Sequence, residues 1–75
     1  MKSKNRDDFT QAVGKRIASL RKISGLTQTK LAESASLDRM TIALIETGKK
    51  KPSMTTIYQL AVALDIEPSN FFIGL

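Results

Sequence analysis

Residues 25–48 decide the fold of this chain, and they read Gly25-Leu26-Thr27-Gln28-Thr29-Lys30-Leu31-Ala32-Glu33-Ser34-Ala35-Ser36-Leu37-Asp38-Arg39-Met40-Thr41-Ile42-Ala43-Leu44-Ile45-Glu46-Thr47-Gly48. Thr27 and Asp38 each carry a side-chain oxygen that can cap the amino terminus of a helix. Gly48 is suited to end a helix, because glycine readily adopts the left-handed conformation common just after a helix. The stretch predicts two short helices joined by a tight turn at Ser36-Leu37, and three lysines follow at once.

A further helix is expected before this stretch, from about Asp7 or Asp8 to Ser24, with Gly25 ending it. The two acids complement the positive end of the helix dipole. One face of this helix is apolar at helical spacing and is expected to be buried. It carries Phe9, Val13, Ile17 and Leu20. Residues 1–6 are lysine-rich and without periodicity, so we expect a flexible basic arm there.

Another helix is expected to start at Ser53, after Pro52, and to bury a face made of Ile57, Leu60, Ala61 and Leu64. The segment Glu67-Pro68-Ser69 breaks the chain again, and Ser69 is expected to cap a short final helical turn. No segment has the alternation of a strand. The prediction is one all-α domain of five short helices at residues 7–75, with the helix-turn-helix at about 27–47 and the carboxyl-terminal helices at about 53–75.

The composition limits the kinds of function. A chain of 75 residues can bury one small core, which leaves no room for a second domain around a deep cleft. It has no Cys and no His, so the usual zinc ligands and the imidazole of Ser-His or Cys-His catalysis are missing. We therefore expect no enzyme activity, no cofactor and no metal. No apolar run is long enough for a bilayer or a signal peptide, and a cytoplasmic location is expected.

Charge is unevenly distributed along the chain. All twelve Lys and Arg residues and five of the seven acids lie in residues 1–51, and only Asp65 and Glu67 follow. A basic portion joined to a slightly acidic, apolar tail suggests one surface for a polyanion and another for packing or self-association. The alternative is that the charge serves solubility alone.

The predicted helix after Asp38 has two different faces. On a wheel of about 100° per residue, Ile42 and Ile45 point toward the core. The opposite face carries Arg39, Met40, Ala43, Leu44 and Thr47. In a DNA major groove, such small and apolar side chains can contact thymine methyl groups while an Arg donates two hydrogen bonds to a guanine edge. The alternative is that Met40 and Leu44 are isolated surface hydrophobic residues.

Several short motifs also recur at a family's usual spacing. They are Gly14-Lys15-Arg16-Ile17, Leu20-Arg21, Gly25-Leu26-Thr27-Gln28, Leu31-Ala32, Ile42, Ile45-Glu46, Gly48 and Leu60-Ala61-Val62-Ala63-Leu64-Asp65. Through them, residues 14–72 resemble the helix-turn-helix domain of phage repressors, Cro proteins and regulators of the xenobiotic-response-element type. Leu37-Asp38-Arg39 and residues 63–68 look most like controller proteins of restriction-modification systems. The resemblance implies a compact, lambda-repressor-like DNA-binding fold.

The resemblance assigns roles to individual residues. Arg39 corresponds to a base-reading position, and its groove neighbours are Met40, Thr41, Ala43 and Leu44. Arg21 and Glu46 correspond to an internal salt bridge. The family often has Gly where this chain has Ser36, and polar residues where it has Met40 and Leu44, so the target sequence does not follow from the resemblance.

Phosphate contacts are expected at both ends of the helix-turn-helix. The residues are Thr27, Gln28, Thr47, Lys49, Lys50 and Lys51. Gln28 corresponds to a glutamine that packs against the recognition helix and hydrogen-bonds the phosphate backbone. Thr27 is first of all a helix cap, and the three lysines have the alternative of an ordinary solvated loop.

The tail places four large apolar side chains within five residues, Phe71, Phe72, Ile73 and Leu75. We expect one aromatic ring to fold into the core near Leu64 and Ile66. The remaining tail residues, with Met54 and Tyr58, are expected to meet the same surface of a second copy. The alternative is a tail wholly absorbed by its own core.

The prediction from the sequence is therefore a DNA-binding transcriptional regulator that acts as a homodimer on a pseudo-palindromic operator. Its partners are double-stranded DNA and a second copy, with no membrane. The alternatives are an antitoxin that uses the same DNA-binding face and a purely structural helical module. Contact with a toxin or with RNA polymerase stays open.

Overall fold

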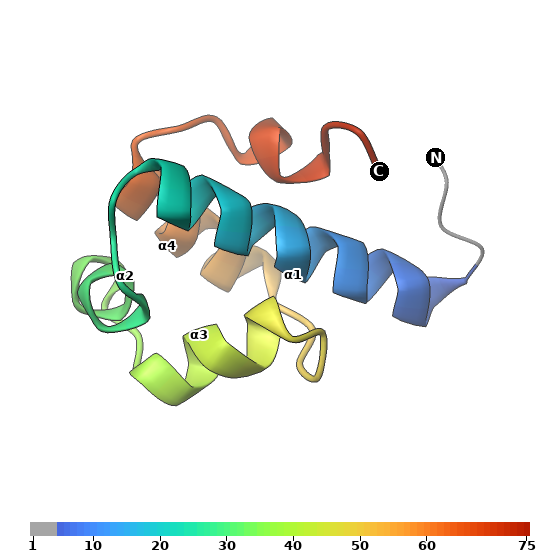
Figure 1. Ribbon diagram of the computed structural model, residues 1–75, viewed down its shortest axis with the longest axis horizontal. Helices are drawn as coiled ribbons and strands as arrows, with labels where there is room; N and C mark the ends of the chain where they lie inside the picture. Colours follow the sequence, from blue (N-terminus) through green and yellow to red (C-terminus); the bar gives the residue numbers. More distant parts are fainter. Residues whose placement is uncertain (1–4) are drawn as a thin grey trace.

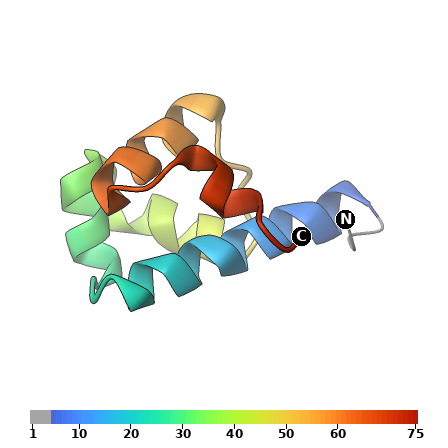
Figure 2. The ribbon, with the colours of Figure 1, turned by 90° about the horizontal axis from the view of Figure 1, so that it is seen from above.

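In a computed structural model that describes residues 5–75, four α-helices are followed by one 3-10 helix. Their bounds are α1 Arg6–Ile23, α2 Gln28–Ala35, α3 Arg39–Glu46, α4 Met54–Leu64 and η1 Pro68–Phe72. The long α1 crosses the molecule, with α3 on one side and η1 on the opposite side (Figure 1). Seen from above, η1 lies over α1 and α4 (Figure 2), and it packs against both. Within these residues there is no strand, so the all-α prediction is confirmed, but the fifth element is a 3-10 helix.

The predicted caps Thr27 and Asp38 form as expected, and Ser53, where the next helix was expected to start, is the cap of α4. Thr27, Asp38 and Ser53 each accept the backbone N–H three residues ahead, at 3.1, 2.7 and 3.0 Å. Each bond satisfies a donor that a helix start would otherwise leave free. None of the helices among residues 5–75 is long and apolar enough to cross a membrane.

α1 begins one residue earlier than the expected start at about Asp7. The helix begins at Arg6, because the Asn5 side chain accepts the backbone N–H groups of Asp7 and Asp8 at 2.9 and 3.0 Å. Asn5 and Arg6 therefore belong to the helix start and not to the basic arm expected at 1–6. The rest of that predicted arm, residues 1–4, lies outside the described residues.

The predicted start of the last element was wrong. η1 begins at Pro68 after Glu67, with no side-chain cap, and Ser69 lies inside it. Proline fits the first position of a helical turn, because its φ is preset and it has no N–H to leave unsatisfied. Asn70 N–H donates to the Glu67 carbonyl at 3.0 Å and closes the turn.

The turn between α2 and α3 depends on a left-handed residue. Ser36 has φ +59°, and the Leu37 N–H donates to the Ala32 carbonyl at 2.9 Å, which ends α2. Non-glycine residues rarely adopt this conformation, so glycine would be the easier residue at this position. Ser36 supplies the same backbone shape and starts the chain toward Asp38.

The core is built from the apolar faces of all five elements. Its largest fully buried side chains are Ile17, Leu31, Ile42, Ile45, Leu60 and Phe71. Phe9, Leu20, Ile66 and Leu75 are partly buried against it. The helical periodicity thus predicted the buried faces of α1, α3 and α4.

The backbones of α1 and α3 meet at Gly14. A Cβ atom on Gly14 would overlap the Ile45 carbonyl oxygen and would lie 3.1 Å from the Glu46 carbonyl oxygen. Both obstacles are backbone atoms, which cannot rotate away as a flexible side chain can. Any side chain at position 14 therefore forces α3 away from α1.

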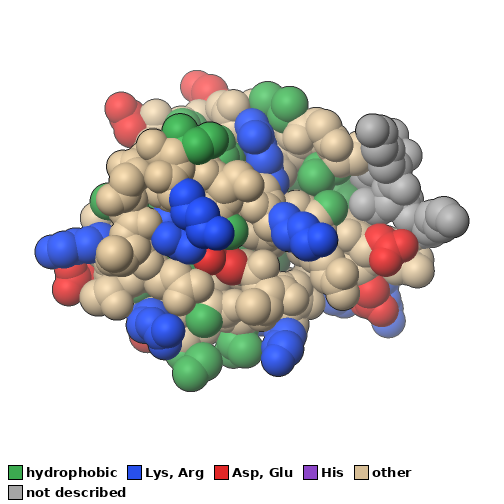
Figure 3. Space-filling model, viewed as in Figure 1, with side chains coloured by type: hydrophobic (Ala, Val, Ile, Leu, Met, Phe, Trp, Pro, Cys, Tyr) green, Lys and Arg blue, Asp and Glu red, His purple; other side chains and the backbone are tan. Residues whose placement is uncertain are grey.

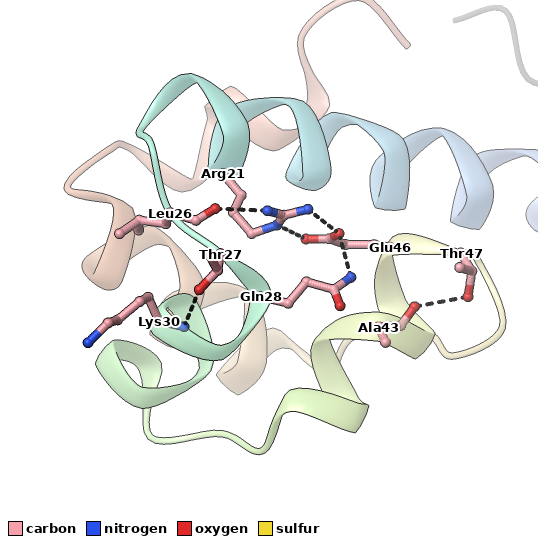
Figure 4. Close-up of polar contacts among 8 residues, drawn as sticks. All are labelled: Arg21, Leu26, Thr27, Gln28, Lys30, Ala43, Glu46 and Thr47. Carbon is pink, nitrogen blue, oxygen red and sulfur yellow. Dashed lines mark hydrogen bonds and ion pairs between the residues drawn. The ribbon is translucent and has the colours of Figure 1, made fainter.

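A buried ion pair joins the same two helices. Arg21 Nε and Nη2 donate to the two Glu46 carboxylate oxygens at 2.7 and 3.0 Å, and its Nη1 donates to the Leu26 carbonyl at 2.8 Å (Figure 4). Gln28 Nε2 donates to Glu46 Oε1 at 3.0 Å, so the carboxylate also holds the first turn of α2. The Arg21 and Glu46 side chains are 11% and 6% exposed. The hydrogen bond with Glu46 raises the pKa of Arg21, so the guanidinium group stays charged at neutral pH.

Replacing Gly14 by Ala should destabilise the protein. Overpacking of this kind costs about 1–3 kcal/mol, which outweighs the gain of up to about 1 kcal/mol from replacing Gly in a helix. Thermal and urea unfolding measure the change. Ser19→Ala, on the exposed face of α1, is the matched control and should change the unfolding free energy by less than about 0.5 kcal/mol. A Gly14→Ala protein as stable as the parent would contradict the close contact.

Replacing one member of the Arg21–Glu46 pair by Met should cost more stability than replacing both. A single replacement strands a nearly buried charge, which costs about 3–5 kcal/mol in fully buried cases, whereas a double replacement leaves none. A double-mutant cycle with Arg21→Met and Glu46→Met, read by urea unfolding, measures the coupling.

The control cycle uses Lys30→Met and Glu33→Met. That pair is 3.8 Å apart, with side chains 70% and 64% exposed, so its coupling should be close to zero. Equal coupling in the two cycles would mean that water reaches Arg21 and Glu46 as freely as it reaches the surface pair.

Candidate nucleic-acid interface

α3 exposes a face that is almost free of charge. Ile42 and Ile45, each 1% exposed, fix the inner face of the helix in the core. On the outer face, Met40 is 58% exposed, and Ala43 and Leu44 are half-buried. The two isoleucines therefore set the rotation of α3 and turn these three apolar side chains outward together.

Arg39 and Thr41 lie at the start of α3. The Arg39 side chain is exposed. Thr41 is half-buried, and its backbone N–H donates a hydrogen bond to the Asp38 carboxylate. Hydrogen bonds from Thr41 lower the pKa of Asp38. The carboxylate is therefore ionised at neutral pH and sits at the positive end of the helix dipole.

The lysine loop is held to the end of α3 by its backbone. Gly48 has φ +77°, and the N–H groups of Lys49 and Lys50 both donate to the Leu44 carbonyl, at 2.9 and 3.2 Å. The side chains of Lys49, Lys50 and Lys51 are exposed. The run is therefore anchored beside the outer face of α3, with its ammonium groups in solvent.

The Thr47 hydroxyl is used inside its own helix. It points to the Ala43 carbonyl at 2.9 Å (Figure 4) and to the Leu44 carbonyl at 3.2 Å. Its single hydrogen is thus committed to the carboxyl end of α3, and only the oxygen lone pairs remain for another donor. A phosphate accepts hydrogen bonds and does not donate them at neutral pH, so the expected contact from the Thr47 hydroxyl would require this internal bond to break.

The start of α2 lies close to α3. The Thr27 oxygen accepts from the Lys30 N–H, and the Gln28 amide bonds Glu46 on α3 (Figure 4). Gln28 keeps its carbonyl oxygen and one amide hydrogen for other partners. The backbone N–H groups at the start of α2 point out of the helix, as at any helix amino terminus. The first turn of α2 is thereby held in a fixed position relative to the outer face of α3.

Cations outnumber carboxylates around α3. On the face that carries α1 and α3, Lys and Arg side chains lie on several sides of α3 (Figure 3). Within residues 5–75 the only side-chain ion pairs are Arg21–Glu46 and Lys30–Glu33. Arg39 and the three lysines after Gly48 therefore carry charges that no carboxylate of the described chain neutralises by contact.

The tail residues expected at a dimer interface divide into two groups. Met54, Tyr58, Phe72 and Ile73 are exposed, by 80%, 65%, 40% and 58% respectively. Phe71 is fully buried, so including it in a surface for a second copy was wrong; it is the aromatic residue that folds into the core. Leu75 is partly buried against the same core.

The sequence analysis did not identify Val62 as an exposed apolar residue beside Met54 and Tyr58. It is 60% exposed on α4 and follows Met54 and Tyr58 at a spacing of four residues. That i, i+4, i+8 spacing was the available signal, because it puts the three side chains on one helical face. We call Met54, Tyr58 and Val62 the α4 stripe.

Comparison with known proteins agrees with this geometry. A profile of the helix-turn-helix family HTH_3 matches residues 17–71. The immunity repressor protein of Bacillus phage phi105 is 46% identical over 57 residues, which are 76% of this chain and 40% of that protein. The uncharacterised HTH-type transcriptional regulator y4dJ of Sinorhizobium fredii is 32% identical over 59 residues, which are 79% of this chain and 77% of that protein.

A solved structure is similar over nearly its whole length. The restriction-modification controller protein C.AhdI of Aeromonas hydrophila superposes with a TM-score of 0.84 at 39% identity, over 85% of this chain and 97% of that one. The chain thus spans less than half of the phage repressor but almost all of the controller protein. With a family profile over residues 17–71 and α2 and α3 in the expected arrangement, the chain belongs to the helix-turn-helix family of DNA-binding transcriptional regulators.

Proposed function

We propose that this protein binds a pseudo-palindromic operator as a homodimer and regulates transcription from it. The observation that carries the proposal is the outer face of α3, which is uncharged except for Arg39 and is flanked by unpaired cations. A face exposed only to water has no need to combine apolar side chains with a surrounding ring of positive charge. A face seated in a major groove does, because the bases lie between two phosphate backbones.

The base contacts are proposed to come from α3. Arg39, exposed at the helix start, donates two hydrogen bonds to a guanine edge. Met40, Ala43 and Leu44 contact thymine methyl groups or base edges through apolar surface, and Thr41 lies at the border of this contact. The specificity of α3 for a DNA sequence would therefore come from the hydrogen bonds of Arg39 and from the fit of the apolar side chains against the bases.

The phosphate contacts are proposed to come from both sides of α3. Lys49, Lys50 and Lys51 extend from the anchored loop on one side. On the other side the amino terminus of α2, with Gln28 beside it, offers N–H groups and a positive dipole end to a phosphate. The carboxylate of Glu46 on α3 holds Gln28 at the start of α2. The amino terminus of α2 therefore keeps a fixed distance from α3 and from the lysine loop that follows it.

The second copy is proposed to bind along the α4 stripe and Ile73. These four side chains are large, apolar and at least 58% exposed. A two-fold axis through such a patch makes the contact self-complementary. It also presents two copies of α3 to successive major grooves, which are about 34 Å apart. The names of the similar proteins, a phage immunity repressor and a controller of a restriction-modification system, agree with regulation of this kind.

Arg39→Ala should relax specificity, whereas Lys50→Ala should weaken binding to all DNA alike. Loss of a bidentate guanine contact costs about 1–3 kcal/mol on the preferred site and flattens discrimination at one base pair in each half-site. Loss of a phosphate contact should also lower the slope of log K against log salt by about 1 per contact. Fluorescence anisotropy with a selected operator and with random duplex DNA, at several salt concentrations, measures both effects.

If Arg39→Ala lowers the affinity for operator and random DNA equally, Arg39 contacts phosphate and not a base. If the parent binds duplex DNA with no dependence on salt, the proposed phosphate clamps are absent. Lys22 is an exposed cation in the last turn of α1. Lys22→Ala is the control and should change neither the discrimination between operator and random DNA nor the salt dependence.

Tyr58→Lys with Val62→Lys should convert the dimer into a monomer. Each replacement removes apolar contact area and brings like charges together across the two-fold axis. Sedimentation velocity at tens of micromolar compares this variant with the parent. The parent should sediment as a dimer and the variant as a folded monomer. A monomeric parent would contradict a stable free dimer, and a dimeric variant would move the interface away from α4.

A further inference from the structure

A cavity of about 290 Å³ opens on the surface where the beginning of α1, the loop before α4 and the end of η1 meet. Its walls come from segments far apart in the sequence: Phe9 and Val13 on α1, Pro52 in the loop, Ile57 on α4 and Phe72 on η1. Val13 and Ile57 are 3% and 5% exposed, so the floor of the cavity is the protein core. This volume lies just below the range of small-molecule pockets, roughly 300–1,000 Å³.

The floor and sides of the cavity are apolar. The rings of Phe9 and Phe72 stack with their centroids 6.2 Å apart and their planes 3° apart, so they line the cavity as a parallel aromatic pair. Thr10 also lines the cavity, but its hydroxyl donates to the Arg6 carbonyl at 2.8 Å. Its hydrogen is therefore not available to a ligand, and the interior suits a hydrocarbon chain.

Exposed Met54 and two cations complete the lining of the cavity. Arg6 and Lys51 are both exposed and both border it, and neither forms an ion pair within residues 5–75. No Asp or Glu side chain is among the residues that line it. The lining therefore combines an apolar interior with a positive edge that is not neutralised locally.

We propose that this cavity binds a medium-chain carboxylate, with the alkyl chain against Phe9, Phe72 and Ile57 and the carboxylate between Arg6 and Lys51. The apolar interior takes the chain, and the two cations take the single negative charge. Charge-assisted hydrogen bonds from Arg and Lys to a carboxylate are among the stronger polar contacts available to a protein.

The same charges disfavour a second copy of the protein as the occupant. A two-fold contact places a patch against itself, so Arg6 and Lys51 of one copy would approach the same residues of the other. No carboxylate in the lining offsets that repulsion. The α4 stripe itself carries no charge; its Met54 also lines the cavity, whereas Tyr58 and Val62 do not.

Binding at this cavity should be coupled to DNA binding, a consequence that rests on the function proposed above. Lys51 belongs to the lysine loop assigned to phosphate contact, so a carboxylate paired with Lys51 competes with a phosphate for it. The ligand should therefore lower the affinity for the operator, and by thermodynamic linkage the operator should lower the affinity for the ligand by the same factor.

Octanoate is the probe, added without DNA to the full 75-residue chain and followed by methyl NMR spectra. The methyl groups of Val13 and Ile57 report on the cavity, and those of Leu31, fully buried on α2, serve as the internal control. Saturable shifts at Val13 and Ile57, with Leu31 unmoved, are expected. The dissociation constant should fall about fourfold for each methylene added between hexanoate and octanoate. Octanol should bind more weakly than octanoate.

The variant Arg6→Gln with Lys51→Gln should lose the preference for octanoate over octanol. The control, Lys15→Gln with Lys22→Gln, removes the same charge from exposed sites on α1 that do not line the cavity, and it should keep the preference. Shifts that do not saturate, that include Leu31 equally, or that survive unchanged in the Arg6 and Lys51 variant would overturn the site. So would octanoate shifts caused only by dissociation of a dimer, since a second copy would then fill the cavity.

Operator affinity with and without octanoate tests the coupling. An affinity that octanoate lowers in the parent but not in the Arg6→Gln, Lys51→Gln variant supports it, and an affinity unchanged at saturating octanoate overturns it. A protein that binds octanoate but no duplex DNA would leave the carboxylate site standing and overturn the coupling together with the proposed function.

Discussion

The structure depends on the contact between the backbones of α1 and α3 at Gly14. Because nothing but hydrogen separates the two helices there, the carbonyl groups of Ile45 and Glu46 lie directly against α1. This approach brings Glu46 within reach of Arg21 two helical turns further along α1, and the same carboxylate then holds Gln28 on α2. A larger residue at position 14 would separate the helices and leave a buried charge without its partner. The orientation of the outer face of α3 thus follows from one missing side chain.

Local features of the sequence predicted the helices well. A capping residue acts on an amide three positions away, so Thr27, Asp38 and Ser53 could be identified without any knowledge of the fold. Apolar periodicity likewise predicted the buried faces of α1, α3 and α4. The errors occurred where several residues could do the same local task. Asn5 caps α1 ahead of the two aspartates, and in a short irregular tail the sequence does not distinguish buried Phe71 from exposed Phe72.

The candidate site could be predicted only in part, for the same reason. The uncharged outer face of α3 and the three lysines after it are continuous in the sequence, and a helical wheel brings them together. The consequence of Gly14 depends on α3, which follows about 30 residues later, so the spacing within α1 gives no sign of it. The cavity joins α1, the loop before α4 and η1, and only the folded chain brings Phe9 within stacking distance of Phe72.

The shortness of α2 and α3 has a consequence for how the protein responds to heat. Each has eight residues, fewer than the roughly 12–15 that an isolated helix needs to be stable in water. Neither can persist once the core opens, so the outer face of α3 is lost together with the whole domain. Small changes in core packing therefore translate directly into the temperature at which regulation stops. Weakened core variants of such a protein would act as thermal switches, active when cool and silent a few degrees higher.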